Sequence, residues 1–220
     1  MIPLPPGYLS RVRKLTLKYD VLLILDEVAT GFGRTGKMFA SEHESVSPDL
    51  MALAKGLTGG YLPLAATLAT EEIFNAFLGP YESFKTFFHG HSYTGNQLGC
   101  AVALENLDIF EKEKVLEKLQ PKIDLMKTLL AGFQDLSSVG DIRQVGFVGI
   151  IEMVENKTTR TPFPLKEQRG LRVCLEARKL GLLIRPLGNI LVLIPPLSTT
   201  RGELKQMFAI LRKSIETVFP

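Results

Sequence analysis

The sequence predicts an α/β protein, with a larger mixed domain followed by a smaller α+β domain. Short apolar segments that end at Asp26 and Lys55 alternate with helix-like segments, which indicates a sheet covered by helices. Near residue 135 the composition changes, and strand-like segments follow two long helices. The chain has 220 residues, 45% hydrophobic and 22% charged, which is enough for one large or two smaller domains.

The larger domain is expected to span residues 1–135. The run VLLILD is continuously apolar, as in a parallel strand buried on both faces in the middle of a sheet. Asn96 is expected to cap the helix that follows it. In chain order we expect a helix over 8–19, a buried strand over 21–26, a Gly-rich loop, strands over 50–54 and 64–69, a helix from 70 to about 77, an aromatic functional loop over 84–96, and helices from 97 to about 114 and on to about 133.

The smaller domain is expected to span residues 136–220. Its last segment has helical periodicity and begins after Thr200, a good N-terminal cap. In chain order we expect a strand over 142–153, a helix over 165–180, a hairpin over 182–193 and a closing amphipathic helix over 200–218.

Bulk composition favours a cytoplasmic protein without nucleic acid or membrane partners. The net charge is +3, from 26 Lys+Arg against 23 Asp+Glu, and no basic run stands out. No apolar run reaches the ~18 residues of a membrane span, and the N-terminus has no signal-peptide pattern. Cys100 and Cys174 lie in apolar, helix-like surroundings, so we interpret both as buried thiols.

One stretch, LLILDEVATGFGRTGKM, has the spacing of a phosphate-binding loop. Such a loop needs a strand that leads directly into the Gly-rich turn, but DEVAT separates the strand from Gly31. The residue after Lys37 should carry a hydroxyl for magnesium, and it is Met38. We therefore expect that this stretch is not a nucleotide site.

The two strand ends suggest another chemistry. In open α/β sheets, ligands bind outside the carboxyl ends of the strands, and Asp26 and Lys55 end two strands that follow each other in the chain. An Asp that faces a pyridinium nitrogen and a Lys that binds an aldehyde are what pyridoxal phosphate requires. Alone, each residue is more simply a turn cap or a solvated strand end. Gly56 beside the Lys, and Val28 two residues beyond the Asp, favour the cofactor interpretation.

Longer stretches resemble a known family. LILDEVATGFGRTGKMFASEH and PDLMALAKGLTGGYLPLAATLAT resemble the class III aminotransferases, which are fold type I pyridoxal-phosphate enzymes, and the likeness covers nearly the whole chain. HGHSYTGNQLGCAVALENL and IRPLGNILVLIPPL narrow it to members that convert 8-amino-7-oxononanoate to 7,8-diaminononanoate in biotin synthesis. The resemblance implies the C-terminal part of the large domain plus the small domain. We therefore expect that the sequence starts partway through a larger protein.

The resemblance also implies roles for single residues. Asp26 pairs with the pyridine nitrogen, Val28 packs against one ring face, and Lys55 binds the cofactor aldehyde. Ser92 stands where the family usually has Thr, whose hydroxyl binds the cofactor phosphate of the neighbouring subunit, so a homodimer is implied.

Two arginines are implied to serve the substrate. Arg34 falls at a position that lines the substrate site, and Arg185 matches the arginine that binds a substrate carboxylate. The resemblance implies S-adenosylmethionine or lysine as the amino donor, and HGHSYTGNQLGC resembles the lysine-using subgroup more closely.

Several residues keep simpler interpretations. Glu27 either has a chemical role or braces the loop that follows it. His43 is expected at the surface, and Arg143 at the surface or in an ion pair. His89 and His91 have no third ligand at suitable spacing, so no metal site is predicted.

Two other functions stay open from the sequence. One is another class III ω-aminotransferase, of the ornithine or 4-aminobutyrate type. The other is a chain without activity of its own, which needs the first part of the family's fold.

Overall fold

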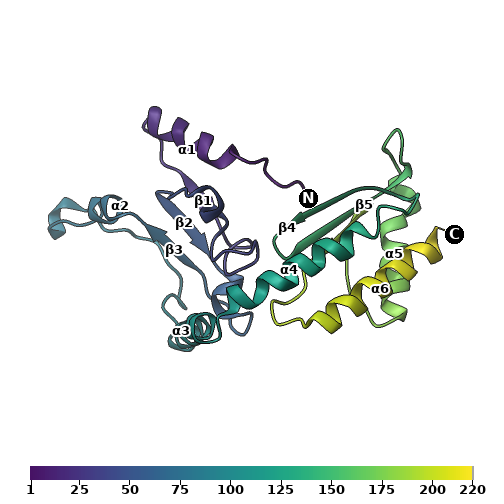
Figure 1. Ribbon diagram of the computed structural model, residues 1–220. Helices are drawn as coiled ribbons and strands as arrows, with labels where there is room; N and C mark the ends of the chain where they lie inside the picture. Colours follow the sequence, from purple (N-terminus) through teal and green to yellow (C-terminus); the bar gives the residue numbers. More distant parts are fainter. Residues whose placement is uncertain (220) are drawn as a thin grey trace. The chain divides into compact units, whose positions relative to one another are not determined.

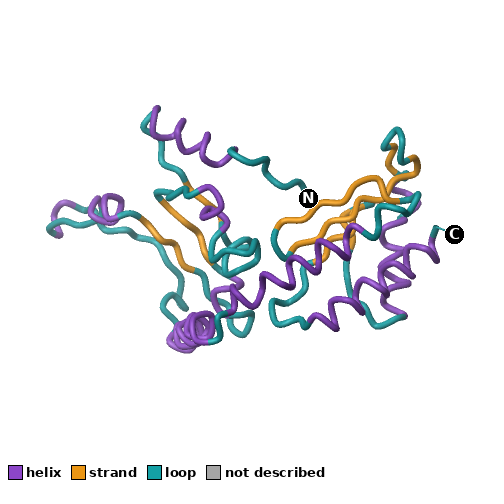
Figure 2. Tube along the Cα trace, viewed as in Figure 1, coloured by secondary structure: helices purple, strands orange, loops and turns teal. Residues whose placement is uncertain are grey.

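The computed structural model describes residues 1–219, which form two compact units. The first unit is Leu4–Glu117, and the second begins at Lys118 and also includes Met1–Pro3. The division falls inside a helix, α4 (Val115–Ala131), whereas the sequence placed a domain boundary after this helix, near residue 135. Figures 1 and 2 show mixed helices and strands in both units, in agreement with the predicted α/β class.

The first unit is built on a three-stranded sheet of order β1-β2-β3. Strands β1 and β2 are parallel, and β2 and β3 are antiparallel, so the sheet is mixed. Its elements are α1 (Tyr8–Lys18), β1 (Ile24–Asp26), the 3-10 turn η1 (Ala40–Glu44), β2 (Leu50–Leu53), the 3-10 turn η2 (Lys55–Thr58), β3 (Ala66–Ala69), α2 (Glu71–Ala76), the 3-10 turn η3 (Tyr81–Ser83) and α3 (Gln97–Lys112).

The predicted buried strand over 21–26 is wrong in extent and in burial. Strand β1 has three residues, and Ile24 is 65% exposed. The reason is its place in the sheet: among the described strands, β1 pairs only with β2 and forms an edge. A run of apolar residues shows that a segment can be buried, but it does not show whether neighbouring strands cover it.

Asp49, the residue before β2, fixes β1 and α1 against the sheet. Its carboxylate accepts hydrogen bonds from both terminal nitrogens of Arg13 on α1, at 2.7 and 3.1 Å, and from the backbone N–H of Leu23 at 2.7 Å. The bond from Arg13 holds the pKa of Asp49 below its ordinary value. These contacts join α1 and the start of β1 to the start of β2, in the parallel pair that places Asp26 opposite Ala52.

The core of the first unit lies between β2, the Gly-rich loop and α3. It consists of Phe32, Met51, Leu53, Leu57 and Ala103. The predicted cap of α3 is confirmed, because the Asn96 side-chain oxygen accepts a hydrogen bond from the N–H of Gly99 at 2.9 Å.

The second unit packs helices against an antiparallel sheet of order β4-β5-β8-β7, with β6 paired to β5. Fully buried side chains such as Phe147, Ile151 and Leu211 form its core. Its elements after α4 are β4 (Val139–Val145), β5 (Val148–Asn156), β6 (Thr161–Pro162), the 3-10 turn η4 (Leu165–Glu167), α5 (Arg169–Lys179), β7 (Pro186–Leu187), β8 (Ile190–Leu193) and α6 (Arg201–Val218).

Three predicted elements differ in detail. The strand over 142–153 is two strands, because the chain reverses at Gly146, whose φ of 51° is left-handed. The helix over 165–180 is interrupted at Gln168, which also has a positive φ. The hairpin over 182–193 is shorter, with β7 and β8 joined at Gly188. The Thr200 cap is confirmed by a reciprocal hydrogen-bonded pair with Glu203.

Among residues 1–219, no helix combines the length and the apolar character that a membrane span requires.

Candidate active site

Asp26 and Lys55 leave the sheet at the same edge. Because β1 and β2 are parallel and Asp26 pairs with Ala52, the carboxyl ends of both strands lie side by side. Lys55 follows Ala52 by three residues and lies two residues beyond the end of β2. Both side chains are exposed, so both can reach a ligand at this edge.

The chain turns as soon as it passes Asp26. One Asp26 carboxylate oxygen accepts a hydrogen bond from the N–H of Val28 at 3.0 Å, and Val28 already belongs to a turn. The strand therefore does not stay extended to Val28, and its half-buried side chain is placed by this turn and not by strand alternation. The hydrogen bond fixes the Asp26 carboxylate at the mouth of the loop.

Glu27 points the other way and is only 3% exposed. Its carboxylate accepts hydrogen bonds from the Thr30 hydroxyl and from the backbone N–H groups of Ala40 and Ser41, the last two at 3.1 and 2.8 Å. Its own N–H donates to Ala52 at 3.0 Å. These contacts close the loop from residue 27 to 41 around one buried carboxylate and favour the bracing interpretation of Glu27.

We expect Glu27→Gln to lower the free energy of unfolding by about 1–3 kcal/mol, because the amide turns an N–H donor toward groups that are donors themselves. Urea titration followed by circular dichroism measures this. Glu82→Gln, at an exposed position of η3, is the matched control and should change little. Equal stability of both variants would contradict the bracing role.

The Gly-rich loop lacks the geometry of a phosphate-binding loop, as the sequence predicted. Turns and bends follow Gly31 through Phe39, and the next regular element is the short η1, so no α-helix begins after Lys37. Gly33 and Gly36 adopt φ values of 84° and 94°, which glycine tolerates and other residues disfavour.

This loop carries Arg34 and is held by His43. The ring Nε2 of His43 lies 3.0 Å from the carbonyl oxygen and 3.1 Å from the hydroxyl of Thr35, the residue after Arg34. His43 is exposed, as predicted, but its contact with the loop was not foreseen. Arg34 is half-buried, and burial lowers the pKa of its guanidinium from the ordinary value.

Lys55 has an unusual backbone conformation. Its φ is 46°, in the left-handed region that non-glycine residues seldom occupy. Gly56 follows, and a Cβ at that position would lie 2.7 Å from the Cβ of the buried Phe32. The turn is also bound from α3, where the side-chain amide of Asn106 donates to the carbonyl oxygens of Gly56 and Leu57 at 2.9 and 3.2 Å. Sequence reasoning missed Asn106, because no local pattern marks a contact across 50 positions.

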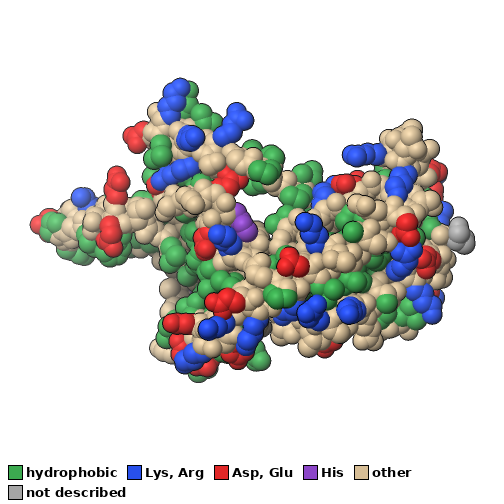
Figure 3. All heavy atoms as spheres, in the orientation of Figure 1, with side chains coloured by type: hydrophobic (Ala, Val, Ile, Leu, Met, Phe, Trp, Pro, Cys, Tyr) green, Lys and Arg blue, Asp and Glu red, His purple; other side chains and the backbone are tan. Residues whose placement is uncertain are grey.

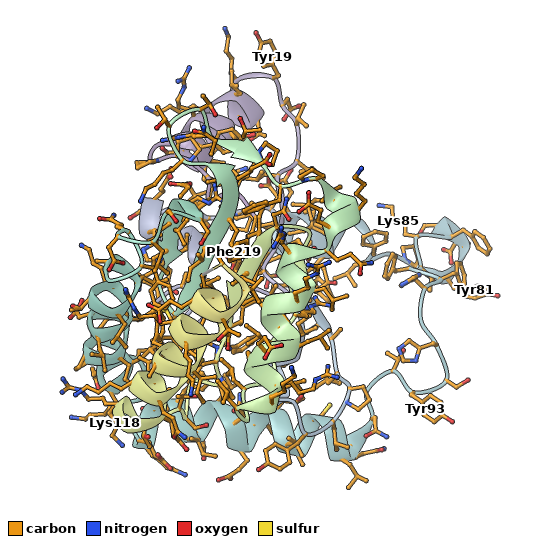
Figure 4. All side chains as sticks on the ribbon, turned by 90° about the vertical axis from the view of Figure 1, so that its right-hand side faces the viewer. Tyr19, Tyr81, Lys85, Tyr93, Lys118 and Phe219 are labelled. Carbon is orange, nitrogen blue, oxygen red and sulfur yellow. The ribbon has the colours of Figure 1, made fainter. Side chains whose placement is uncertain are left out.

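Ser92 lies on an exposed aromatic arm, residues 77–95, between α2 and α3. Figure 4 labels two of its tyrosines, Tyr81 and Tyr93, which are 90% and 77% exposed, and Figure 3 shows apolar atoms along the projecting α2 segment. Ser92 is itself exposed.

Arg185 belongs to the second unit, where it is exposed and immediately precedes β7. In the same unit Arg143 forms ion pairs with Asp141 and Glu152 at 2.8 and 2.7 Å, as the ion-pair interpretation predicted. Burial raises the pKa of the Cys174 thiol to about 11, so this cysteine stays protonated at neutral pH.

A family model described as aminotransferase class-III matches residues 1–215 of the chain. The adenosylmethionine-8-amino-7-oxononanoate aminotransferase of Aquifex aeolicus is 55% identical over 216 residues, which is 98% of this chain and 48% of that protein. The enzyme of the same name from Staphylococcus aureus is 47% identical over 97% of this chain and 47% of its own length. The chain therefore spans about half the length of the curated relatives it matches.

Solved structures of aminotransferases also resemble this chain. The crystal structure of adenosylmethionine-8-amino-7-oxononanoate aminotransferase from Methanocaldococcus jannaschii has a TM-score of 0.95 and 49% identity, over 99% of this chain and 50% of that one. The PMP-bound form of an aminotransferase from Vibrio fluvialis has a TM-score of 0.93 and 31% identity, over 100% and 48% of the two chains.

Proposed function

Because the chain belongs to the class III aminotransferases, we propose that it carries the catalytic lysine and aspartate of a pyridoxal-phosphate enzyme that aminates 8-amino-7-oxononanoate to 7,8-diaminononanoate in biotin synthesis. The observation that carries the proposal is the position of Asp26 and Lys55 at the carboxyl ends of two adjacent parallel strands. The relatives' names support the substrate, and 55% identity to one of them supports its transfer to this chain.

The residues at this edge fit the cofactor. An exposed carboxylate and an exposed amine project from neighbouring strand ends. Gly56 follows Lys55, and a Cβ at that position would lie 2.7 Å from the Cβ of Phe32, so the turn after the lysine packs tightly against the core. An acid for the ring nitrogen and an amine for the aldehyde are the two protein groups that pyridoxal phosphate needs.

When bound, pyridoxal phosphate supplies an electron sink that makes the proton on the amine-bearing carbon of the substrate acidic. Asp26 would hold a proton on the pyridine nitrogen through charge pairing. Lys55 would bind the aldehyde, give it up to the donor amine, and then carry the proton between the substrate carbon and the cofactor carbon with its free Nζ. Val28 would pack against one ring face.

The two arginines are proposed to bind substrate. Arg185 would bind the carboxylate of the keto acceptor with its planar guanidinium. Arg34 would line the substrate site. We propose S-adenosylmethionine as the donor, because the relatives' names contain it. Parallel assays with S-adenosylmethionine and lysine decide between the two donors that the sequence left open.

We expect Arg185→Ala to raise the KM for the keto acceptor by about 10- to 100-fold, with little change in cofactor affinity, because a charged hydrogen bond to a carboxylate is lost. Steady-state kinetics with varied acceptor measure this. Arg201→Ala, at the exposed first position of α6, is the control. An unchanged acceptor KM would remove Arg185 from the site.

We further propose a cytoplasmic homodimer with shared sites. The aromatic arm supports the dimer, since monomers seldom expose several large aromatic side chains in one segment, and Ser92 on that arm would donate its hydroxyl to the cofactor phosphate of the neighbouring subunit. The two free cysteines, Cys100 and Cys174, suit a reducing compartment.

The test is covalent trapping. The purified full chain is mixed with pyridoxal phosphate, reduced with borohydride and mapped by mass spectrometry of its peptides. Label at Lys55 alone is the expected result. A folded chain with no label, or with label spread over exposed lysines, would overturn the proposal and favour a chain without activity of its own. An ω-aminotransferase of another type would also take the label. It would use ornithine or 4-aminobutyrate as its amino donor in preference to aminating 8-amino-7-oxononanoate.

A further inference from the structure

The turn that presents Lys55 is held by a side chain from a distant helix. Asn106, in the middle of α3, donates one side-chain amide to the carbonyl oxygens of both Gly56 and Leu57. We propose that Asn106 is a positioning residue, which holds the backbone of η2 so that the Lys55 amine stays at the strand edge beside Asp26. The inference rests on the proposed function, because that function gives the Lys55 amine its role.

The conformation of Lys55 requires such support. At a φ of 46° the Cβ of an L-residue crowds the backbone, and this conformation persists only where the surroundings over-determine it. The turn has few internal hydrogen bonds to do so. The N–H of Leu57 donates to Ala54 at 3.0 Å and the N–H of Gly59 to Gly56 at 3.2 Å.

Asn106 binds both carbonyls of a single 3-10 turn, which no α-helix follows. The Gly56 carbonyl also accepts the N–H of Gly59, so Asn106 adds a second donor there and binds Leu57 as well. The side-chain oxygen of Asn106 is also close, since a Cβ on Gly59 would lie 3.1 Å from it. Gly59 has a φ of 60°, so the end of the turn and its contact with α3 both depend on glycine.

Phe32 supports the same turn from the other side. It is buried and stands 2.7 Å from where a Cβ of Gly56 would be. Phe32 resists movement of the turn toward the core, but it has no hydrogen-bonding group to orient the carbonyls. Asn106 adds the side-chain hydrogen bonds that orient the carbonyls of Gly56 and Leu57, beside the backbone bonds within the turn.

The test compares Asn106→Asp with Asn75→Asp in the full chain. Asn106→Asp keeps the shape but places a charged acceptor against two carbonyl oxygens. Asn75 is exposed on α2, so its variant controls for the added charge. The first readout is the rate at which pyridoxal phosphate becomes fixed to Lys55 under borohydride. The second is the pH profile of Lys55 acetylation by trace acetic anhydride without cofactor.

We expect Asn106→Asp to slow fixation at Lys55 by about tenfold, the effect of one lost hydrogen bond at the upper end of the usual range. We also expect it to shift the acetylation profile of Lys55 alone among the lysines. Asn75→Asp should do neither. Asn106→Leu, which removes the donor without adding charge, should reproduce the loss if Asn106→Asp fails to fold.

Unchanged labelling and an unchanged acetylation profile in folded Asn106 variants would overturn the inference. So would the unfolding of both variants, because the role of Asn106 would then be structural. If the unaltered chain takes no label at Lys55, the proposed function fails instead, while the acetylation profile, which needs no cofactor, still reports whether Asn106 controls the Lys55 amine.

Discussion

Replacing Lys55 with alanine is expected to remove at least about 10⁴-fold of the transamination rate and all covalent attachment of pyridoxal phosphate, while the fold persists. The side chain is exposed, so its removal leaves no cavity. No other exposed group at the strand edge, among the residues that the structure describes, can both bind the aldehyde and carry the proton. Initial rates of 7,8-diaminononanoate formation measure the loss, and circular dichroism checks the fold.

The chain offers a closely matched control. Lys114, between α3 and α4, is exposed and has a φ of 52°, close to the 46° of Lys55. Lys114→Ala therefore reproduces the loss of an exposed amine from a left-handed backbone without touching the site. We expect its rate and stability to match those of the unaltered chain. Transamination retained in Lys55→Ala would exclude the assigned role of this lysine.

Asp26→Asn is expected to reduce the rate by about 10²–10³-fold, the usual cost of removing one preorganised electrostatic group. Asparagine keeps the side-chain oxygen that accepts the 3.0 Å hydrogen bond from Val28, so the turn at the mouth of the loop is preserved. What is lost is the negative charge that would keep the pyridine nitrogen protonated.

Loss of the Asp26 charge should also be visible in the absorption spectrum of the bound cofactor. A ring that loses its proton should change the absorption of bound pyridoxal phosphate, whereas a misfolded loop should abolish binding. Asp20→Asn is the control: Asp20 is exposed, precedes the same strand, and has a left-handed φ of 53° that asparagine tolerates. If Asp26→Asn and Asp20→Asn had the same rate, the charge of Asp26 would have no part in the reaction.

The sequence predicted local features correctly where one residue type is required for a simple physical reason. Asn96 and Thr200 were recognised as caps because their side chains satisfy N–H groups at helix starts, and the structure confirms both. The Gly-rich stretch was separated from a phosphate-binding loop by Met38 and by the distance from the strand to Gly31, which local order alone reveals.

Sequence-based predictions were wrong where a feature depends on residues that are distant in the chain. The run VLLILD reads as a central strand, yet β1 is a short edge strand, because pairing partners decide burial. One apolar segment over 142–153 became two strands, since Gly146 permits a reversal that periodicity does not reveal. Glu27 could have had either of two roles, and only its three hydrogen bonds within the loop favour the brace.

The sequence by itself determined the α/β class, the identity of Asp26 and Lys55 as strand-end residues, and a family resemblance that the comparisons confirm. Only the tertiary structure decided that these two residues share an edge, that Lys55 sits in a left-handed turn, and that Asn106 binds this turn from α3. The physical reason is range. Caps and turns follow from residues a few positions apart, whereas strand register and a hydrogen bond across 50 positions exist only after the chain has folded.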